Sequence, residues 1–166
     1  MASDLTVWVL DTSALIEFKR LIAVNDQWRA FKALEDLVAK GRIALHKEVI
    51  REVSKIAHPD LPGAWAPGVE QLLRYPGEVA FSYLRTAMSS ASEVIDKNKS
   101  EEDADPYMLS LGLWLVDQGR KPVVVTGDLV DHEPIRISVG TACERLGLPY
   151  TDALTFLTTV GIPTKT

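Results

Sequence analysis

Short apolar runs separated by helical patterns are the feature that most limits how this chain can fold. Residues 5–10 and 122–126 are rich in Val, Leu and Thr. Such continuous runs are typical of strands that are buried on both faces of a parallel sheet. Shorter runs at 42–45 and 149–150 predict two more strands. Because these runs alternate with helical segments, the sequence predicts an α/β fold with right-handed crossovers.

The connecting segments carry helical patterns with recognisable start and stop signals. Apolar spacing and these signals predict helices over residues 13–20, 26–40, 47–57, 67–74, 78–96, 106–118, 138–146 and 152–158. The Pro and Gly content of residues 58–63 predicts a loop there. Residues 58–100 form a helical insertion within a single domain of residues 1–166, since no Gly/Ser-rich linker separates them. The hydrophobic content of 46% suits one compact domain with a core.

Charge and cysteine content narrow the class of protein. The net charge is −5, whereas a protein that coats nucleic acid regardless of its sequence is more often basic. Any nucleic acid would therefore be held by a local basic patch or through a basic partner. The single cysteine, Cys143, excludes an intramolecular disulfide and favours the cytoplasm; we expect it in the core. The N-terminal apolar run is too short for a signal peptide, and no run is long enough to cross a membrane.

Four acidic residues stand where a predicted strand ends or a predicted helix begins. Asp11 and Asp128 follow the runs 5–10 and 122–126, Glu52 lies in the helix over 47–57, and Asp105 directly precedes Pro106. The carboxyl ends of parallel strands line one crevice, where binding sites form. Carboxylates gathered there would repel one another, which raises their pKa values, and would hold a hard cation such as Mg²⁺ or Mn²⁺. This pattern indicates a metal-dependent enzyme that acts on phosphate esters.

Each acid also has a purely structural alternative, which for Glu52 is a solvated helix residue that pairs with Lys55 or Arg51. Asp11 could cap the helix that follows it, although Thr12 and Ser13 could cap equally well and leave the carboxylate free. Asp105 could be an N-cap with Pro106 as the first helical residue, a role that is compatible with cation binding. Asp128 could be a turn residue after Gly127.

The neighbouring acids and the histidines add further alternatives. On a helical wheel Glu52 lies nearer the buried face, whereas Glu48 faces solvent more fully. Asp103 competes with Asp105 but lies in a more polar stretch. Asp131 could be an auxiliary ligand three residues after Asp128. For the three histidines, which show no metal-ligand spacing, we expect structural or solvated roles: His46, His58 and His132. Basic candidates for contacting a phosphate are Arg136, Lys55, Arg20 and Lys19.

The acidic motifs, taken in order, resemble the PIN domain. The similarity covers most of the chain and rests on residues 7–15, 49–53, 104–105 and 125–128. The resemblance implies a three-layer α/β/α sandwich with a mostly parallel sheet of about five strands. It also implies hydrolysis of RNA phosphodiesters that depends on Mg²⁺ or Mn²⁺. Carried over by position, Asp11, Glu52, Asp105 and Asp128 are the catalytic metal ligands, with Thr12 and Thr126 as supporting hydroxyls.

PIN-domain proteins also suggest partners for this chain. Many are toxins of bacterial toxin–antitoxin pairs, so we expect an RNA substrate, a cognate antitoxin and a homodimer. A haloacid-dehalogenase-like phosphatase is disfavoured, because the second Asp of that family falls at Ser13 here. A catalytically inactive PIN-like scaffold that binds RNA or protein stays open as an alternative, since acidic residues alone do not prove activity.

Overall fold

The computed structural model describes residues 6–57, 60–98 and 103–165 and has a parallel sheet at its centre. The sheet has four strands in the order β2-β1-β3-β4. They are β1 (Thr6–Leu10), β2 (Ile43–Ala44), β3 (Lys121–Val125) and β4 (Tyr150–Thr151). All neighbouring strands run parallel. The predicted α/β/α architecture is confirmed, with four strands in the described residues instead of about five.

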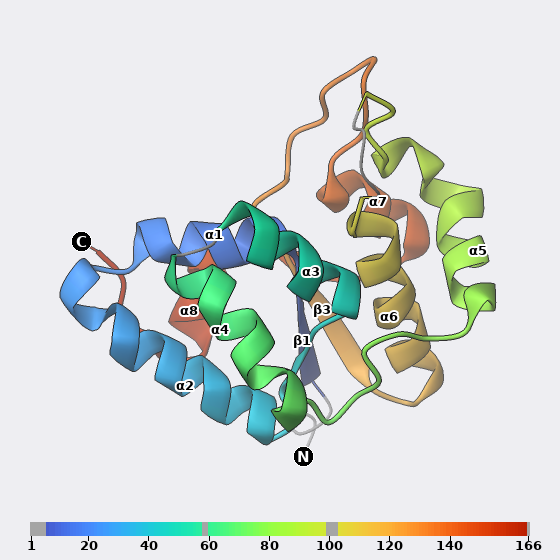
Figure 1. Cartoon of the computed structure of the whole chain (residues 1–166). Coiled ribbons are helices and arrows are strands. Elements are labelled where there is room, and N and C mark those ends of the chain that lie inside the picture. Colours follow the sequence, from blue (N-terminus) through green and yellow to red (C-terminus); the bar gives the residue numbers. More distant parts are fainter. Residues whose placement is uncertain (1–5, 58–59, 99–102, 166) are drawn as a thin grey trace.

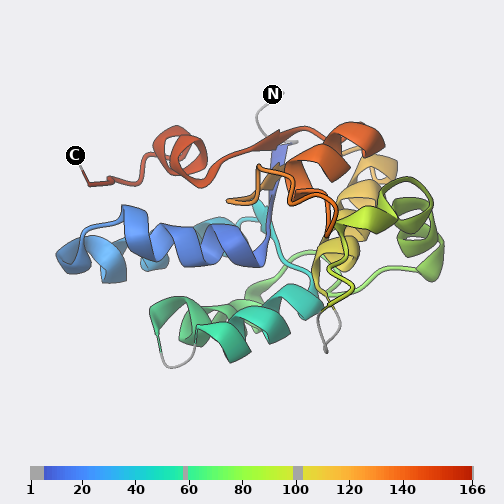
Figure 2. The ribbon, with the colours of Figure 1, turned by 90° about the horizontal axis from the view of Figure 1, so that it is seen from above.

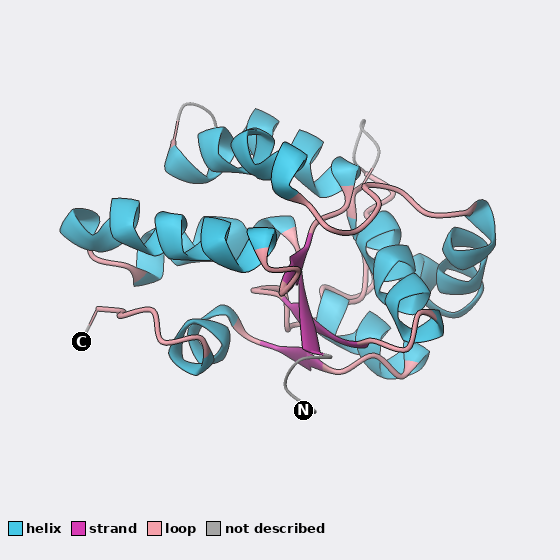
Figure 3. Cartoon of the chain, turned by 90° about the horizontal axis from the view of Figure 1, so that it is seen from below, coloured by secondary structure: helices cyan, strands magenta, loops and turns pink. Residues whose placement is uncertain are grey.

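Helices cover both faces of this sheet. They are α1 (Thr12–Leu21), α2 (Gln27–Ala39), α3 (Lys47–Ile56), α4 (Leu61–Val69), α5 (Phe81–Ala91), α6 (Asp105–Asp117), α7 (Val139–Leu146) and α8 (Ala153–Thr159). Figure 1 shows α1, α2 and α8 on one side of the central strands and α5, α6 and α7 on the other. The view from above in Figure 2 and the view from below in Figure 3 show the same layers around the sheet.

The core forms where the sheet meets its helices. Val7, Val9 and Leu10 of β1 are fully buried. Phe156 of α8, near the end of the sequence, stacks on Phe18 of α1, near its beginning, with ring centroids 5.5 Å apart. Cys143 of α7 is also buried, as its sequence context predicts. In the described part of the chain, no helix is long and apolar enough to cross a membrane.

The region between the second and third strands differs most from the sequence-based expectation. Helix α4 begins at Leu61, inside the predicted loop 58–63; residues 58–59 lie outside the described residues. Pro62 stands in the first helical turn, where a missing backbone N–H costs nothing. The predicted helix 67–74 is the end of α4 followed by a 3₁₀ turn at Glu70–Leu72. The predicted helix 78–96 is shorter, because α5 begins only at Phe81 and ends at Ala91.

Candidate active site

The register of the two central strands brings Asp11 next to Thr126. Leu10 pairs with Val125, so the two residues that follow them stand side by side at the carboxyl end of the sheet. The Thr126 hydroxyl donates a hydrogen bond to Asp11 Oδ2. Asp11 is 1% exposed and Thr126 is fully buried. The strand ends thus present a carboxylate that is held by protein on one side and enclosed by the core.

Asp11 also caps helix α1. Its Oδ1 accepts hydrogen bonds from Ala14 N at 2.7 Å and from Ser13 Oγ at 2.8 Å. A carboxylate oxygen has two acceptor positions, so Oδ1 is fully used, whereas Oδ2 receives only the Thr126 hydroxyl and keeps one position. Asp11 can therefore cap α1 with Oδ1 and bind a ligand with Oδ2.

Ser13 and Thr126 tie the loop after β3 to the start of α1. Ser13 Oγ accepts from Gly127 N at 2.9 Å, and Thr126 Oγ1 accepts from Asp128 N at 2.9 Å. The sequence predicted no contact between Ser13 and the loop after β3, and the bond from Gly127 to Ser13 spans more than 100 residues. Nearby, Thr12 Oγ1 is buried and has no hydrogen-bond partner among the described residues.

The sequence allowed Asp105 to be the N-cap of its helix, but the structure gives it another position. Helix α6 begins at Asp105 itself, and Ala104 is the N-cap residue. Asp103 takes over the capping function, because its Oδ1 accepts from Asp105 N at 3.1 Å. The Asp105 side chain is therefore released from capping, while the N-terminus of α6 remains favourable for negative charge.

Glu52 reaches the same helix start from α3. Its Oε2 accepts a hydrogen bond from Ala104 N at 3.3 Å. Glu48, one turn earlier, forms an ion pair with Arg51 at 2.6 Å. Its side chain is only 17% exposed, so it is less open to solvent than the helical wheel predicted. Glu52 thus joins the α6 carboxylates, whereas Glu48 faces a neighbouring pocket.

The electrostatics show that these carboxylates act on one another. The pKa of Asp105 is raised well above its usual range, first by burial and then by four negative charges: Asp103, Asp11, Glu52 and Asp128. Part of the Asp105 surface is nonetheless accessible. Burial, opposed by the hydrogen bond from Thr126, raises the pKa of Asp11 to about 6. The four predicted site acids therefore share one region, together with Asp103.

Arg136 supplies positive charge at this region. Its Nη1 donates to Asp128 Oδ2 at 2.8 Å, and Val139 N donates to the same oxygen at 3.1 Å. The Arg136 side chain is 20% exposed. Asp128 is thereby fixed between the arginine and the start of α7.

Asp131, predicted as an auxiliary ligand, is directed to the start of α7. Its Oδ1 accepts from Ser138 N at 2.7 Å and from Thr141 Oγ1 at 2.8 Å. These bonds hold the pKa of Asp131 below its usual range. The structure therefore gives this carboxylate a role in ordering the loop after β3.

The other basic candidates lie in different surroundings. Lys19 pairs with Asp60 at 2.5 Å, and Arg20 pairs with Glu17. Lys55 is exposed on α3. For Arg136, burial lowers the pKa, but the hydrogen bond to Asp128 and the charges of Asp128 and Asp105 outweigh burial and raise it.

The two histidines that the structure describes have a structural role or lie on the surface. His46 is the N-cap of α3, with Nδ1 accepting from Glu48 N at 3.0 Å. His132 is exposed and pairs through its backbone with Arg136. His58 lies outside the described residues. An imidazole as N-cap is not signalled by the sequence, because Ser, Thr, Asp and Asn dominate that position.

The acidic region has the donor chemistry of a hard-cation site in an open arrangement. Carboxylate oxygens are the ligands that Mg²⁺ and Mn²⁺ prefer. In the described ranges, no three His, Cys, Asp or Glu side chains are already drawn together into a complete ligand set. The carboxylates match the cation in ligand type and in charge. Cation binding would require them to move towards one another.

Comparisons with known proteins give a family but no activity. A family model described as "Domain of unknown function (DUF4411)" matches residues 8–163. The chain therefore belongs to the DUF4411 family. No curated protein matches it. No solved structure matches it either.

Proposed function

We propose that this member of the DUF4411 family is a metal-dependent ribonuclease that hydrolyses RNA phosphodiester bonds with Mg²⁺ or Mn²⁺. The observation that carries the proposal is the charge around Asp105. Burial and four neighbouring carboxylates raise its pKa, and an isolated cluster of this kind is unfavourable for the fold. A bound divalent cation would offset the repulsion among these carboxylates, so cation binding would account for why they lie together.

Asp11, Glu52, Asp105 and Asp128 would hold the cation. When bound, it would polarise the phosphodiester and lower the pKa of the attacking water. Asp11 is prepared for this role, because Oδ2 retains an acceptor position while Ser13 and Thr126 fix the carboxylate.

Two other residues would position groups around the carboxylates. Asp103 holds the first turn of α6 through Asp105 N, so that the Asp105 side chain is left for the ligand. Arg136, which contacts Asp128 at 2.8 Å, would place a guanidinium beside a phosphate oxygen of the substrate. Its charge offsets part of the local negative potential that would otherwise repel RNA.

The preference for RNA and the biological setting rest on the resemblance to PIN domains. On that basis we propose a toxin that is silenced by a cognate antitoxin and acts as a homodimer in the cytoplasm. The acidic net charge of −5 agrees with a basic partner segment that covers the site.

Cleavage of a labelled RNA with Mg²⁺, Mn²⁺ or EDTA tests the proposal. We expect metal-dependent cleavage, reduced at least about tenfold in Asp11→Asn, because the loss of a ligand weakens metal binding at least as much as the loss of an outer-shell group. Asp152→Asn is the matched control. Asp152 is also an Asp N-cap, accepting from Thr155 N at 2.6 Å, but it is exposed on α8.

The outcomes separate the proposal from its alternative. Cleavage that persists in EDTA or in Asp11→Asn would contradict the assignment of the site. RNA binding without metal-dependent cleavage would instead indicate the inactive scaffold.

A further inference from the structure

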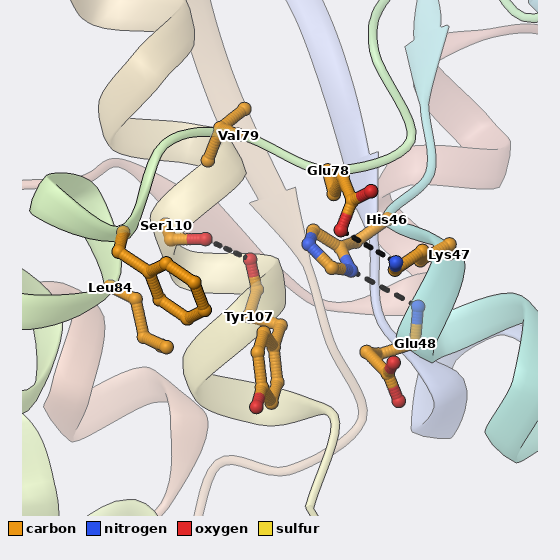
Figure 4. Close-up of a pocket in the computed structure, with 9 residues that line it drawn as sticks. His46, Lys47, Glu48, Glu78, Val79, Leu84, Tyr107 and Ser110 are labelled. Carbon is orange, nitrogen blue, oxygen red and sulfur yellow. Dashed lines mark hydrogen bonds and ion pairs between the residues drawn. The ribbon is translucent and has the colours of Figure 1, made fainter.

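A small pocket lies between the start of α3 and the middle of α6. Its volume is about 210 Å³, and it is lined by His46, Lys47, Glu48, Glu78, Val79, Phe81, Leu84, Tyr107 and Ser110. Figure 4 shows Tyr107, Ser110 and His46 around the same space. This size is below the range of about 300–1,000 Å³ found for drug-sized ligands, so it suits one small group. We call it the His46 pocket.

The His46 pocket adjoins the acidic site through two shared helices. Tyr107 and Ser110 follow Asp105 on α6, so Ser110 is displaced along the axis by about 7.5 Å at 1.5 Å per residue. Glu48 stands one turn before Glu52 on α3. The pocket and the acidic site are therefore built on the same two helices.

His46 presents a fixed hydrogen-bond donor. The side chain is 1% exposed, and burial lowers its pKa to about 4, so the imidazole is neutral near pH 7. Nδ1 accepts the Glu48 amide at 3.0 Å and therefore carries no proton. The proton of the neutral ring must then be on Nε2. Within the described residues Nε2 has no partner, and Figure 4 shows that edge turned away from Glu48 into the pocket.

Ser110 presents an acceptor. Its hydroxyl donates to Tyr107 O at 2.5 Å, which uses its only proton. The lone pairs of Ser110 Oγ therefore remain for a donor on a ligand. The residue is 1% exposed, so this polar atom is enclosed by protein. The His46 pocket thus offers one donor and one acceptor whose directions are set by the fold.

The walls and the rim favour a flat, uncharged group. The Tyr107 ring lies 5.4 Å from the His46 ring, and Val79 and Leu84 contribute apolar surface. The rim charges are paired, with Lys47 to Glu78 at 2.5 Å and Glu48 to Arg51 at 2.6 Å. A phosphate would meet two carboxylates here, whereas a planar ring could lie against the aromatic wall.

We propose that the His46 pocket binds a nucleobase of the RNA strand, next to the phosphate that is cleaved. Nucleobases combine a flat face with neighbouring donors and acceptors on one edge, which complements Tyr107, Ser110 and His46. The inference rests on the proposed ribonuclease function, because it takes its ligand from that substrate.

Binding of single nucleotides tests the pocket without any cleavage. Wild type would be titrated with AMP, CMP, GMP and UMP in EDTA by calorimetry, with ribose 5-phosphate as the ligand that lacks a base. We expect saturable binding of at least one nucleotide and none of ribose 5-phosphate. Ser110→Ala should weaken that binding about three- to tenfold, as the loss of one hydrogen bond does.

Two further variants control for the fold. His46→Asn removes the Nε2 donor but keeps a good N-cap for α3, so it should weaken nucleotide binding while the chain stays folded. Ser89→Ala is the matched control for Ser110→Ala. Ser89 Oγ makes the same bond to the carbonyl three residues earlier, at 2.8 Å, but on the exposed face of α5. It should leave nucleotide binding unchanged.

The two proposals fail in different ways. No saturable nucleotide binding at millimolar concentration, equal binding of ribose 5-phosphate, or an equal loss in Ser89→Ala would overturn the nucleobase pocket, even if RNA is cleaved. Nucleotide binding without RNA cleavage by wild type would support the pocket and reject the ribonuclease.

Discussion

Replacing Asp11 with asparagine should stabilise the metal-free fold at neutral pH. Asparagine has the shape of the protonated carboxyl group and can still accept from Ala14 N. Its amide can donate to Thr126 Oγ1, whose proton then turns towards Ser13 Oγ at 3.3 Å. The substitution removes a buried negative charge without removing the hydrogen-bond network around it.

The magnitude follows from the pKa of Asp11. Burial raises that pKa from 3.8 to about 6 in the folded chain. Because a tenfold change in the acid constant corresponds to about 1.4 kcal/mol, ionising Asp11 costs the fold about 3 kcal/mol at pH 7 and above. For a chain of this length, the corresponding rise in Tm for Asp11→Asn is about 6–12 °C.

The sign of the pH dependence follows from proton binding. Between pH 3.8 and about 6 the folded state binds more protons at Asp11 than the unfolded chain does. The free energy of unfolding of wild type therefore falls as the pH rises from 3.8 to about 6. That of Asp11→Asn does not change in this way, because the variant has no proton to lose at residue 11. The advantage of the variant should be only about 0.6 kcal/mol at pH 4 and nearly complete by about pH 7.

Urea unfolding in EDTA at pH 4, 6 and 8 measures this difference. Asp152→Asn should change the free energy of unfolding little at every pH, because Asp and Asn are equally good N-caps. Adding Mg²⁺ or Mn²⁺ should stabilise wild type by mass action and leave Asp11→Asn unchanged. A variant less stable than wild type at pH 8, or an advantage of the same size at pH 4 and pH 8, would refute the reasoning.

Three further substitutions test the packing and the hydrogen bonds. Phe156→Ala should cost about 3–5 kcal/mol in urea unfolding, because Phe156 is fully buried against Phe18; a loss below about 1 kcal/mol would contradict the stacking. Ser13→Ala should cost about 1–3 kcal/mol at pH 8, since it removes a donor to the Asp11 carboxylate; unchanged stability would disprove that bond. Gly147→Ala should lower Tm through a cost of about 1 kcal/mol, because Gly147 ends α7 with φ of 70°; an unchanged Tm would argue against that backbone conformation.

The sequence predicted the elements that depend on local patterns. Strands β1 and β3 were found from apolar runs, and α2 and α7 end where Gly41 and Gly147 adopt positive φ. Such signals act within a few residues, so they can be read without the fold. The helices between residues 58 and 100 were placed less well, because Pro and Gly there occur at a helix start and inside α4.

The acidic residues of the candidate site were recognisable for the same reason. Asp11 and Asp128 follow apolar runs directly, and parallel strands place their carboxyl ends along one edge. The pKa values of these acids could not be predicted from the sequence, because burial and charges from distant residues determine them. The raised pKa of Asp105 depends on Asp11 and Asp128, which come from other elements.

The sequence by itself determined the α/β alternation and the positions of four acids at strand ends and helix starts. Only the tertiary structure decided what each side chain does there. It gave the capping of α6 to Asp103, divided the two oxygens of Asp11 between α1 and Thr126, and fixed the proton of His46 on Nε2. The physical reason is that a backbone pattern has a short range, whereas hydrogen bonds, burial and charge act between residues that only the fold brings together.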